Sequence, residues 1–367
     1  MLLMVSKSLS FTPLIRPLRP LLRPTASCTL SSLSSSSSPK PTLLPPTPEN
    51  IRRCIRRLEE GGIVALPTET VYGLASTLTP SAKKIFTLKS RPLTSPLIVH
   101  VSSLSQSLPY INCPPPVLST FTSLTTKFWP GPLTVILPSS PLVPSYINAG
   151  TKTVALRCPN NDLTLEILKE RPLCMPSANK YGHISPTSSE HVMSEFEEDD
   201  VWVLEGGEGE VGIESTVVKV GEGGIELLRP GRITATEIRE CLSSSSSPSL
   251  PVTSYVPQIL SPTSSSNGSP GQNLKHYSPN LPCYIIKDVS SVSSDSVYIT
   301  REDAGGKWNI IVGKERGEWE RKLYGALREA ENIQGAKRIF IEEVPHSEEY
   351  DGVRDRVFRA AEGKYYP

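Results

Sequence analysis

The stretch Gly61-Gly-Ile-Val-Ala-Leu-Pro-Thr-Glu-Thr-Val-Tyr-Gly-Leu74 decides the fold of the central part of this 367-residue chain. Ile63–Leu66 is a short apolar run between glycine and proline, a pattern that predicts a buried strand ending at Pro67. Three hydroxyl side chains on alternate residues and one carboxylate follow at once. Ligands of open α/β sheets bind beyond strand ends, so the stretch predicts one wall of a binding site. An ordinary strand exit with polar turn residues is the alternative that this stretch leaves open.

Two cations follow a second predicted element, a helix that starts at Thr79-Pro80. This helix must end near Arg91, because a residue that precedes proline is pushed out of the α region. In the extended conformation that we expect there, Lys89 and Arg91 project to the same side, two residues apart. Two converging cations are poor core residues and good phosphate ligands. Two solvated charges at a helix end would be the plain alternative.

Two further predicted strands carry polar side chains on one face. In Thr153–Arg157 the arginine lies on the inner half of a strand that looks buried, and a buried arginine needs an anionic partner. His100 lies in the strand Pro96–Val101, where alternation places the odd-numbered apolar residues on the other face. A structural hydrogen-bond donor is the alternative to a catalytic histidine at this position.

A cation or a small hydrogen-bonding side chain recurs wherever a predicted strand ends. The recurring residues are Thr70, Lys89, Arg91, Arg157, Ser177, Asn179, Ser215 and Arg229. No hydroxyl nucleophile adjoins a histidine in these segments, and no metal-binding H-E-x-x-H spacing occurs. Such a surface suits a ligand with several negative charges, for example a nucleoside triphosphate together with an amino acid. Its chemistry would rest on positioning and charge stabilisation rather than on covalent attack.

Composition restricts the classes of function. Residues 1–48 carry five basic and no acidic side chains, which leaves 33 basic and 37 acidic residues, a net charge of −4, in the remainder. That sign argues against a nucleic-acid clamp, whose affinity comes mainly from clustered Lys and Arg. The seven scattered cysteines form no C-x-x-C pair, which argues against a zinc site or disulfide framework and fits a reducing compartment. Since no run of 18 apolar residues occurs, we expect no membrane span.

The chain divides into four predicted parts. Residues 1–46 are rich in Ser, Pro and Arg and poor in acid, the composition of a mitochondrial or plastid transit peptide, with a disordered tail of a cytoplasmic protein as the alternative. Residues 47–243 form the main α/β domain. Residues 244–279 form a Ser/Pro-rich linker that ends in the element Ser269-Pro-Gly…Lys275-His-Tyr-Ser-Pro279. Residues 280–367 alternate strand and helix, as in a small α/β module without a catalytic constellation.

Eight motifs match a known family in the same order and at compatible spacing. They are Pro67-Thr-Glu-Thr-Val-Tyr-Gly-Leu74, Lys89-Ser-Arg-Pro92, Pro96-Leu-Ile-Val-His100, Trp129-Pro-Gly-Pro-Leu-Thr134, Thr153-Val-Ala-Leu-Arg157, Pro176-Ser-Ala-Asn179, Gly212-Ile-Glu-Ser-Thr216 and Leu228-Arg-Pro-Gly231. Over about residues 47–243 the chain resembles the YrdC-type threonylcarbamoyl-AMP synthases. The linker element and the α/β tail look like the two-domain form of that family. The fold that this resemblance implies is an α/β fold: a twisted mixed sheet with helices, joined to a small Rossmann-like domain.

The resemblance implies a nucleotidyltransferase that joins L-threonine, bicarbonate or CO2, and ATP into threonylcarbamoyl-adenylate and pyrophosphate. A separate tRNA threonylcarbamoyl transferase would use the product. By position, the residues implied for threonine are Thr70, His100, Arg157, Met175 and Ser215. Those implied for ATP are Lys89, Arg91, Ser95, Thr153, Ser177, Asn179, Ser185, Arg229 and Lys275. Of these, Lys89 and Arg91 would be catalytic, with Mg²⁺ on the phosphates and no stable protein-bound metal.

Two departures from the family pattern and two alternative functions accompany the resemblance. Ser95 stands where asparagine is common, and Gln272-Asn-Leu274 replaces Met-Lys-Tyr in the linker.

A carbamoyltransferase-type module, as in hydrogenase-maturation proteins, is disfavoured because the zinc-finger and acylphosphatase segments expected beside it are missing. A module that binds double-stranded RNA or tRNA is disfavoured by the net charge of −4 without interleaved aromatic residues. We therefore expect weak or no direct tRNA binding.

Overall fold

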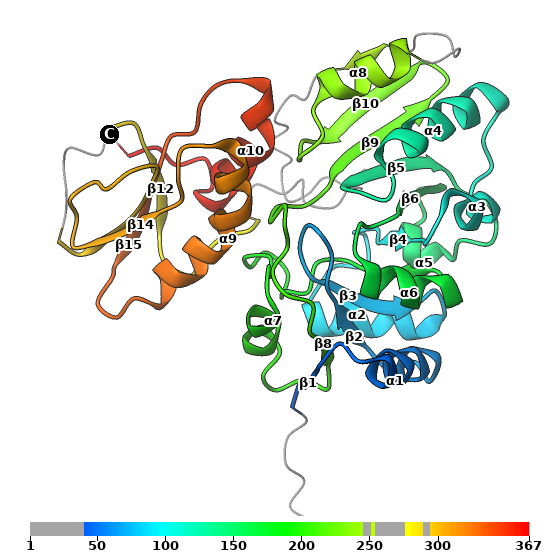
Figure 1. The fold of residues 1–367 in the computed structure, drawn as a ribbon, viewed down its shortest axis with the longest axis horizontal. Helices are drawn as coiled ribbons and strands as arrows, with labels where there is room; N and C mark the ends of the chain where they lie inside the picture. The colour runs from blue at the N-terminus through cyan, green and yellow to red at the C-terminus, as the bar shows by residue number, and fades with distance from the viewer. Residues whose placement is uncertain (1–39, 245–250, 254–275, 289–293, 367) are drawn as a thin grey trace, which may run out of the picture. The chain divides into compact units, whose positions relative to one another are not determined.

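The structure is a computed structural model that describes residues 40–244, 251–253, 276–288 and 294–366. Figure 1 shows how the described elements follow one another along the chain. The segment assigned to a transit peptide lies outside the described residues up to residue 39. Most of the predicted linker lies outside them as well, including Lys275 and Gln272-Asn-Leu274.

One mixed sheet holds eleven strands of the described residues, in the order β1-β8-β2-β3-β7-β4-β6-β5-β9-β10-β11. Parallel and antiparallel pairs alternate irregularly across it: β4 pairs with β6 in parallel, and β6 pairs with β5 in the antiparallel sense. Its strands are β1 (Thr42–Leu44), β2 (Val64–Leu66), β3 (Gly73–Thr77), β4 (Ile98–His100), β5 (Leu133–Pro138), β6 (Thr153–Arg157), β7 (Leu173–Cys174), β8 (Trp202–Leu204), β9 (Thr216–Gly221), β10 (Gly224–Arg229) and β11 (Val252–Thr253).

Helices cover this sheet. They are α1 (Pro48–Glu59), η1 (Pro80–Ala82), α2 (Lys83–Lys89), α3 (Leu104–Ser107), η2 (Leu108–Tyr110), α4 (Pro115–Phe128), α5 (Ser145–Asn148), α6 (Asp162–Glu170), α7 (Ser189–Glu195) and α8 (Ala235–Ser243), with η marking 3₁₀ turns. The first helix begins as its sequence predicts, because the Thr47 side chain accepts a hydrogen bond from the Asn50 amide and Pro48 occupies the first turn. In Figure 1, α4 and α8 lie together beside β5, β9 and β10.

The core between sheet and helices confirms the predicted strand faces. Leu97, Val99 and Val101 belong to the largest apolar cluster, whereas Ile98 and His100 face a pocket on the other side of β4. In β6, the neighbour of β4, Val154 and Leu156 join the same apolar cluster and Arg157 faces the pocket. Side chains alternate across a strand, so these two neighbouring strands present their polar residues to one shared space.

Three details differ from the predictions made from sequence. Residues 42–44, placed in the N-terminal tail, form the edge strand β1, which pairs in parallel with β8. Residues 252–253, placed in the linker, form β11 beside β10. The backbone at Ser90 is left-handed rather than extended, with φ 52° and ψ 38°, because α2 continues to Lys89 and the Arg91 amide donates back to Phe86.

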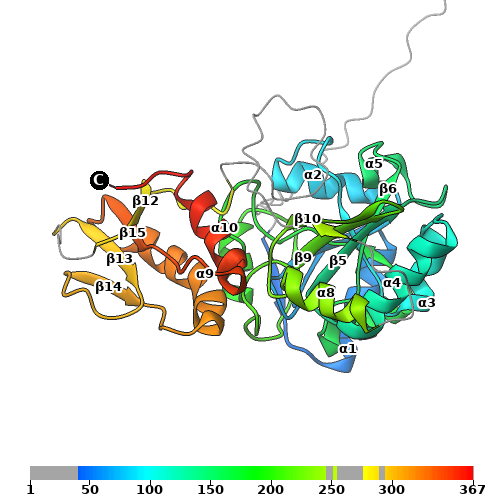
Figure 2. The ribbon, with the colours of Figure 1, turned by 90° about the horizontal axis from the view of Figure 1, so that it is seen from above.

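A second sheet holds four parallel strands of the described residues, in the order β12-β15-β13-β14. Its elements are β12 (Cys283–Ile286), β13 (Ser296–Thr300), β14 (Trp308–Ile311), α9 (Arg316–Asn332), β15 (Arg338–Glu342), η3 (Glu348–Tyr350) and α10 (Asp351–Ala360). In the views of Figures 1 and 2, α9 and α10 lie on the same side of this sheet. The face of α9 that carries Trp319, Leu323 and Leu327 is fully buried. Among the described residues, no helix combines the length and hydropathy that a membrane span requires.

Candidate active site

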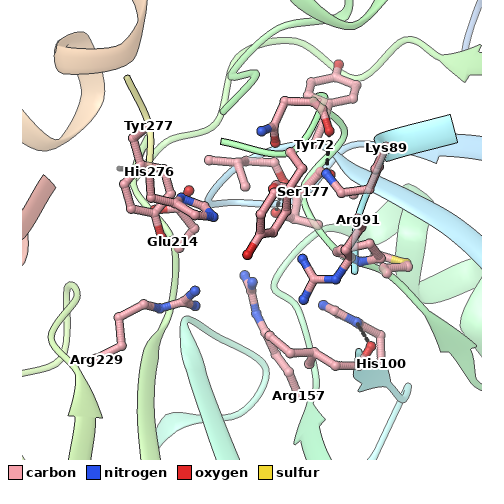
Figure 3. A pocket seen from close by; sticks show the side chains of 18 of the residues that line it. Tyr72, Lys89, Arg91, His100, Arg157, Ser177, Glu214, Arg229, His276 and Tyr277 are labelled. Carbon is pink, nitrogen blue, oxygen red and sulfur yellow. Dashed lines mark hydrogen bonds between the residues drawn. The ribbon is translucent and has the colours of Figure 1, made fainter. Parts of the chain in front are cut away.

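A pocket opens where the polar faces of β4 and β6 meet the turns after β2, α2, β7 and β10. It encloses about 660 Å³ of space free of protein atoms, part of it continuous with solvent. Eight of the predicted site residues line it: Lys89, Arg91, His100, Arg157, Met175, Ser177, Asn179 and Arg229. In Figure 3 the guanidinium groups of Arg91, Arg157 and Arg229 point into this one space. A pocket with three guanidinium groups is built for an anionic ligand.

The stretch after β2 holds Arg157 in place. Its Nη2 donates a hydrogen bond to Thr70 Oγ1 over 2.8 Å and lies 2.8 Å from Glu69 Oε1. The second contact is an ion pair by distance only, since neither Glu69 oxygen accepts a hydrogen bond from the described residues. Thr68 fixes the turn by donating from its hydroxyl to the Val71 carbonyl. The sequence did not predict the contact between Arg157 and Glu69, because the two residues lie 88 positions apart.

Lys89 and Arg91 are both buried and are held by backbone carbonyls. Lys89 Nζ donates to the Ser177 carbonyl over 2.6 Å and also to the Asn179 carbonyl. Arg91 donates from Nη2 to Pro96 over 2.9 Å and from Nε to Ser95 over 3.3 Å. Burial, with the charge of Arg91 added, lowers the pKa of Lys89 well below its usual value, and burial lowers the pKa of Arg91 to about 10. An anion that enters the pocket therefore relieves an electrostatic penalty already present in the empty site.

Arg229 closes another side of the pocket from the end of β10. Its Nη2 donates to the Ser215 carbonyl over 2.9 Å and to the Ser215 hydroxyl over 3.1 Å, and that hydroxyl shares a hydrogen bond with Thr134. The neighbouring Glu214 also lines the pocket, and Ser185 donates its hydroxyl to Glu214 Oε1 over 2.5 Å. Glu214 lies inside a quoted motif, yet nothing local in the sequence marks it as part of the site.

His100 is a neutral polar group in this pocket at ordinary pH. Burial, together with the nearby charge of Arg157, lowers the pKa of His100 to about 3. One ring nitrogen lies 3.3 Å from the Ile98 carbonyl. At neutral pH the ring can hydrogen-bond a ligand but, without the imidazolium proton, cannot act as a general acid.

The end of the predicted linker element also reaches the pocket. His276 and Tyr277 line it and are both buried, and burial lowers the pKa of His276 to about 3. The ring of His276 packs edge-on against Tyr181 with centroids 6.0 Å apart. The unusual composition of this segment was noticed in the sequence, but only Lys275 was assigned to the site.

Five predicted site residues within the described part of the chain do not line the pocket. Four of them support residues that do: Thr70 contacts Arg157, Ser215 contacts Arg229, Ser185 contacts Glu214, and Ser95 offers its carbonyl to Arg91. The fifth, Thr153, lies at the start of β6, at the opposite end of the strand from Arg157, and its hydroxyl shares a hydrogen bond with Thr151. The direct ligand contacts assigned to these five residues stay predictions.

Comparison with known proteins relates this chain to a family. Residues 56–231 match the Sua5/YciO/YrdC family model, described as "Telomere recombination", and residues 233–362 match the model described as "Threonylcarbamoyl-AMP synthase, C-terminal domain". A threonylcarbamoyl-AMP synthase of Pyrococcus abyssi is 38% identical over 290 residues, which cover 74% of this chain and 82% of the relative. One of Bacillus subtilis is 32% identical over 329 residues, covering 84% and 91%.

A solved structure resembles the whole fold. The crystal structure of P. abyssi Sua5 complexed with L-threonine superimposes with a TM-score of 0.78 at 29% sequence identity. The match covers 89% of this chain and 98% of that structure, so it spans both sheets. Together with the two family models and the curated relatives, this likeness shows that the chain belongs to the threonylcarbamoyl-AMP synthase family.

Proposed function

We propose that this chain is an L-threonylcarbamoyladenylate synthase, a nucleotidyltransferase that forms threonylcarbamoyl-AMP and pyrophosphate from L-threonine, bicarbonate or CO2, and ATP. The observation that carries the proposal is the convergence of Lys89, Arg91, Arg157 and Arg229 on one pocket of a chain in this family. The relative from P. abyssi was solved with L-threonine, one of the three substrates. The product serves the formation of threonylcarbamoyladenosine in tRNA.

Threonine binds at the end of the pocket formed by β4 and β6. Arg157 binds its carboxylate, and Thr70 and Glu69 beneath Arg157 fix the direction of the guanidinium group. His100 is neutral there and offers a hydrogen bond rather than a second positive charge. Met175 forms the apolar wall beside Gly73, where a Cβ atom would approach the Met175 methyl group to 3.0 Å.

The triphosphate binds at the end formed by α2 and the β10 exit. Lys89, Arg91 and Arg229 face it, with Ser177 and Asn179 in the loop that anchors Lys89. When the carbamate oxygen attacks the α-phosphate, negative charge builds on the phosphate oxygens, and fixed cations stabilise that transition state. These side chains are held before the ligand arrives, so little reorganisation is needed.

Magnesium enters with the nucleotide. Glu69 and Glu214, two carboxylates near the pocket, each lie against an arginine, so magnesium would take phosphate oxygens and water as its ligands. Within the residues that the structure describes, no cluster of three or more His, Cys, Asp or Glu side chains could hold a metal ion. In this proposal magnesium binds together with the substrate nucleotide.

Two parts of the proposal concern the cell rather than the pocket. The product passes to a separate threonylcarbamoyl transferase in a transient encounter. The N-terminal composition supports import into a mitochondrion or a plastid, with a cytoplasmic enzyme as the alternative. Fractionation of cells that express the tagged full chain decides between them.

The test of the activity is incubation of the full chain with ATP, bicarbonate and each amino acid in turn. Pyrophosphate release that appears with threonine and requires bicarbonate supports the proposal. The adenylate itself is identified by mass spectrometry after rapid quenching. The proposal would be refuted if none of the amino acids led to pyrophosphate release. Release with an amino acid other than threonine would also refute it.

A further inference from the structure

Glu214 is an electrostatic anomaly in a pocket for a triphosphate. Its carboxylate lines the space that Lys89, Arg91 and Arg229 face, and the side chain is 8% exposed. Burial acts to raise its pKa, but the charges of Arg356 and Arg229 outweigh burial and lower the pKa to about 2. The group is therefore ionised at neutral pH, and a bare carboxylate beside a polyanion would repel it.

Two side chains from the C-terminal part of the chain hold this carboxylate. Arg356 of α10 places Nε 2.8 Å from Glu214 Oε2, and Tyr324 of α9 donates its hydroxyl to the same oxygen over 2.8 Å. Arg356 is completely buried, and Tyr324 is buried as well. Each belongs to a helix that packs on the four-stranded sheet, whereas Glu214 lies two residues before the start of β9 in the large sheet.

Arg356 also holds two adjacent backbone segments beside the nucleotide pocket. Its Nη2 donates to the Glu214 carbonyl over 3.3 Å, and its Nη1 donates to the Pro230 carbonyl over 2.8 Å. Pro230 directly follows Arg229, so one guanidinium group joins the Glu214 turn to the exit of β10. The fit is close, since a Cβ atom at Gly352 would lie within 3.0–3.1 Å of the Gly231 backbone.

The charge of Arg356 is balanced along α10. Asp355 lies 3.0 Å from Arg356 Nη1 and also pairs with Arg359 at 3.0 Å. Two arginines thus share Asp355, and Arg356 supplies the remaining positive charge to Glu214. The ring of Tyr277 lies 5.4 Å from the guanidinium carbon of Arg356, which brings the linker element to the same group.

We propose that Arg356 is a positioning residue for nucleotide binding: it cancels the charge of Glu214, so that a pocket of the N-terminal part admits a triphosphate only when the C-terminal helices are docked. Tyr324 assists by orienting the carboxylate. This inference rests on the proposed function, because it takes ATP as the ligand of that pocket. It also gives the C-terminal domain a role in the reaction without placing a catalytic residue in it.

The decisive experiment is a double-mutant cycle on the full chain, read by calorimetric binding of ATP and by KM for ATP and for threonine. Arg356→Met removes the ion pair that compensates most of the Glu214 charge, and we expect ATP affinity to fall about tenfold or more while threonine affinity changes less than threefold. Arg356→Met combined with Glu214→Gln removes both charges and is expected to restore ATP affinity to within threefold of the parent chain.

Two further variants separate charge from architecture. Arg356→Lys keeps the positive charge and is expected to retain ATP affinity within threefold. Arg354→Met, a matched change on the same helix, removes the pair with the partly exposed Asp351 and a hydrogen bond to the Pro345 carbonyl, and is expected to leave ATP affinity unchanged. Thermal unfolding of every variant checks that it is folded.

Several results would overturn the proposal. ATP affinity that stays within threefold in Arg356→Met contradicts it, as does an equal loss in the single and double variants, which would indicate a merely structural arginine. If Arg356→Met does not fold, the other two variants still test the proposal. A tenfold loss of ATP affinity in Arg356→Lys or in the double variant would then contradict it. Calorimetry reports ATP binding directly, so these results can be told apart from a failure of the proposed function. The proposed function is tested only by the synthase activity of the parent chain.

Discussion

The two ends of the pocket hold their cations in opposite ways. At the proposed phosphate end, Lys89 and Arg91 donate to backbone carbonyls, which carry only partial charge and neutralise neither side chain. At the threonine end, Arg157 lies against Glu69, and the pair is close to neutral. The difference matches the substrates: ATP is a polyanion, whereas threonine is a zwitterion with no net charge. Net charge attracts the first, and geometry selects the second.

Arg157→Met tests the threonine end and has the largest expected effect. The change leaves Glu69 as a buried charge without a partner, so we expect the free energy of unfolding to fall by about 3–5 kcal/mol. Glu69→Gln in the same chain should recover most of that stability, while the KM for threonine stays raised. Chemical denaturation and threonine-dependent pyrophosphate release measure the two quantities. Equal stability of the single and double variants would contradict the ion pair.

Arg91→Ala tests the phosphate end. We expect a loss of about 2–4 kcal/mol of transition-state stabilisation, because a fixed charge aimed at the developing phosphate charge is removed. Unlike the change at Arg157, it strands no carboxylate, so the free energy of unfolding should change much less. Pyrophosphate release at saturating ATP and threonine is the measurement. A rate near that of the parent chain would remove Arg91 from the chemistry.

The pH dependence of stability sharpens the same contrast through His100, which lies beside Arg157. Its pKa is about 3 in the folded chain and near 6.5 when unfolded, so its stabilising contribution is complete above pH 6.5 and is lost as the pH falls toward 3. Between pH 7 and pH 5 we expect it to account for about 2 kcal/mol of lost stability. His100→Gln should flatten the denaturation-against-pH curve by that amount. An unchanged curve would show that the ring is already charged in the folded state.

Tyr324→Phe has the smallest expected effect. It removes one hydrogen bond to Glu214 but leaves the charge of Arg356 in place, so we expect about 1–2 kcal/mol of lost stability. The KM for ATP should rise less than threefold, in contrast to Arg356→Met. A larger rise would mean that the orientation of the carboxylate, rather than its neutralisation, controls nucleotide binding.

Local sequence patterns predicted the elements that build the pocket. The alternation in β4 and β6 placed His100 and Arg157 on the ligand side, because side-chain direction in a strand follows from the period of two. Patterns with weaker periodicity received no prediction. Helix α4, for example, is rich in Ser and Thr, and three of its threonines donate their hydroxyls to carbonyls four residues back, as Thr120 does to Pro116.

What sequence could not supply are contacts between distant segments. Glu69 and Glu214 both appeared in quoted motifs, but their roles depend on Arg157 and Arg356, which lie 88 and 142 positions away. The extended conformation predicted around Ser90 was wrong for a local reason. Restriction by the following proline applies to Arg91, and the left-handed residue that ends α2 lies one position earlier.

The edge strand β1 limits how the chain can be trimmed. Residues 42–44 pair with β8, the Thr42 amide donates to the Val201 carbonyl, and the Leu44 side chain is buried. A processing protease that cuts before Lys40 would leave this strand intact. A cut at residue 46 would remove it and expose the hydrogen-bonding edge of β8 to pairing with another molecule. If the chain is imported as proposed, a maturation cut must fall before β1 to keep this strand in the sheet.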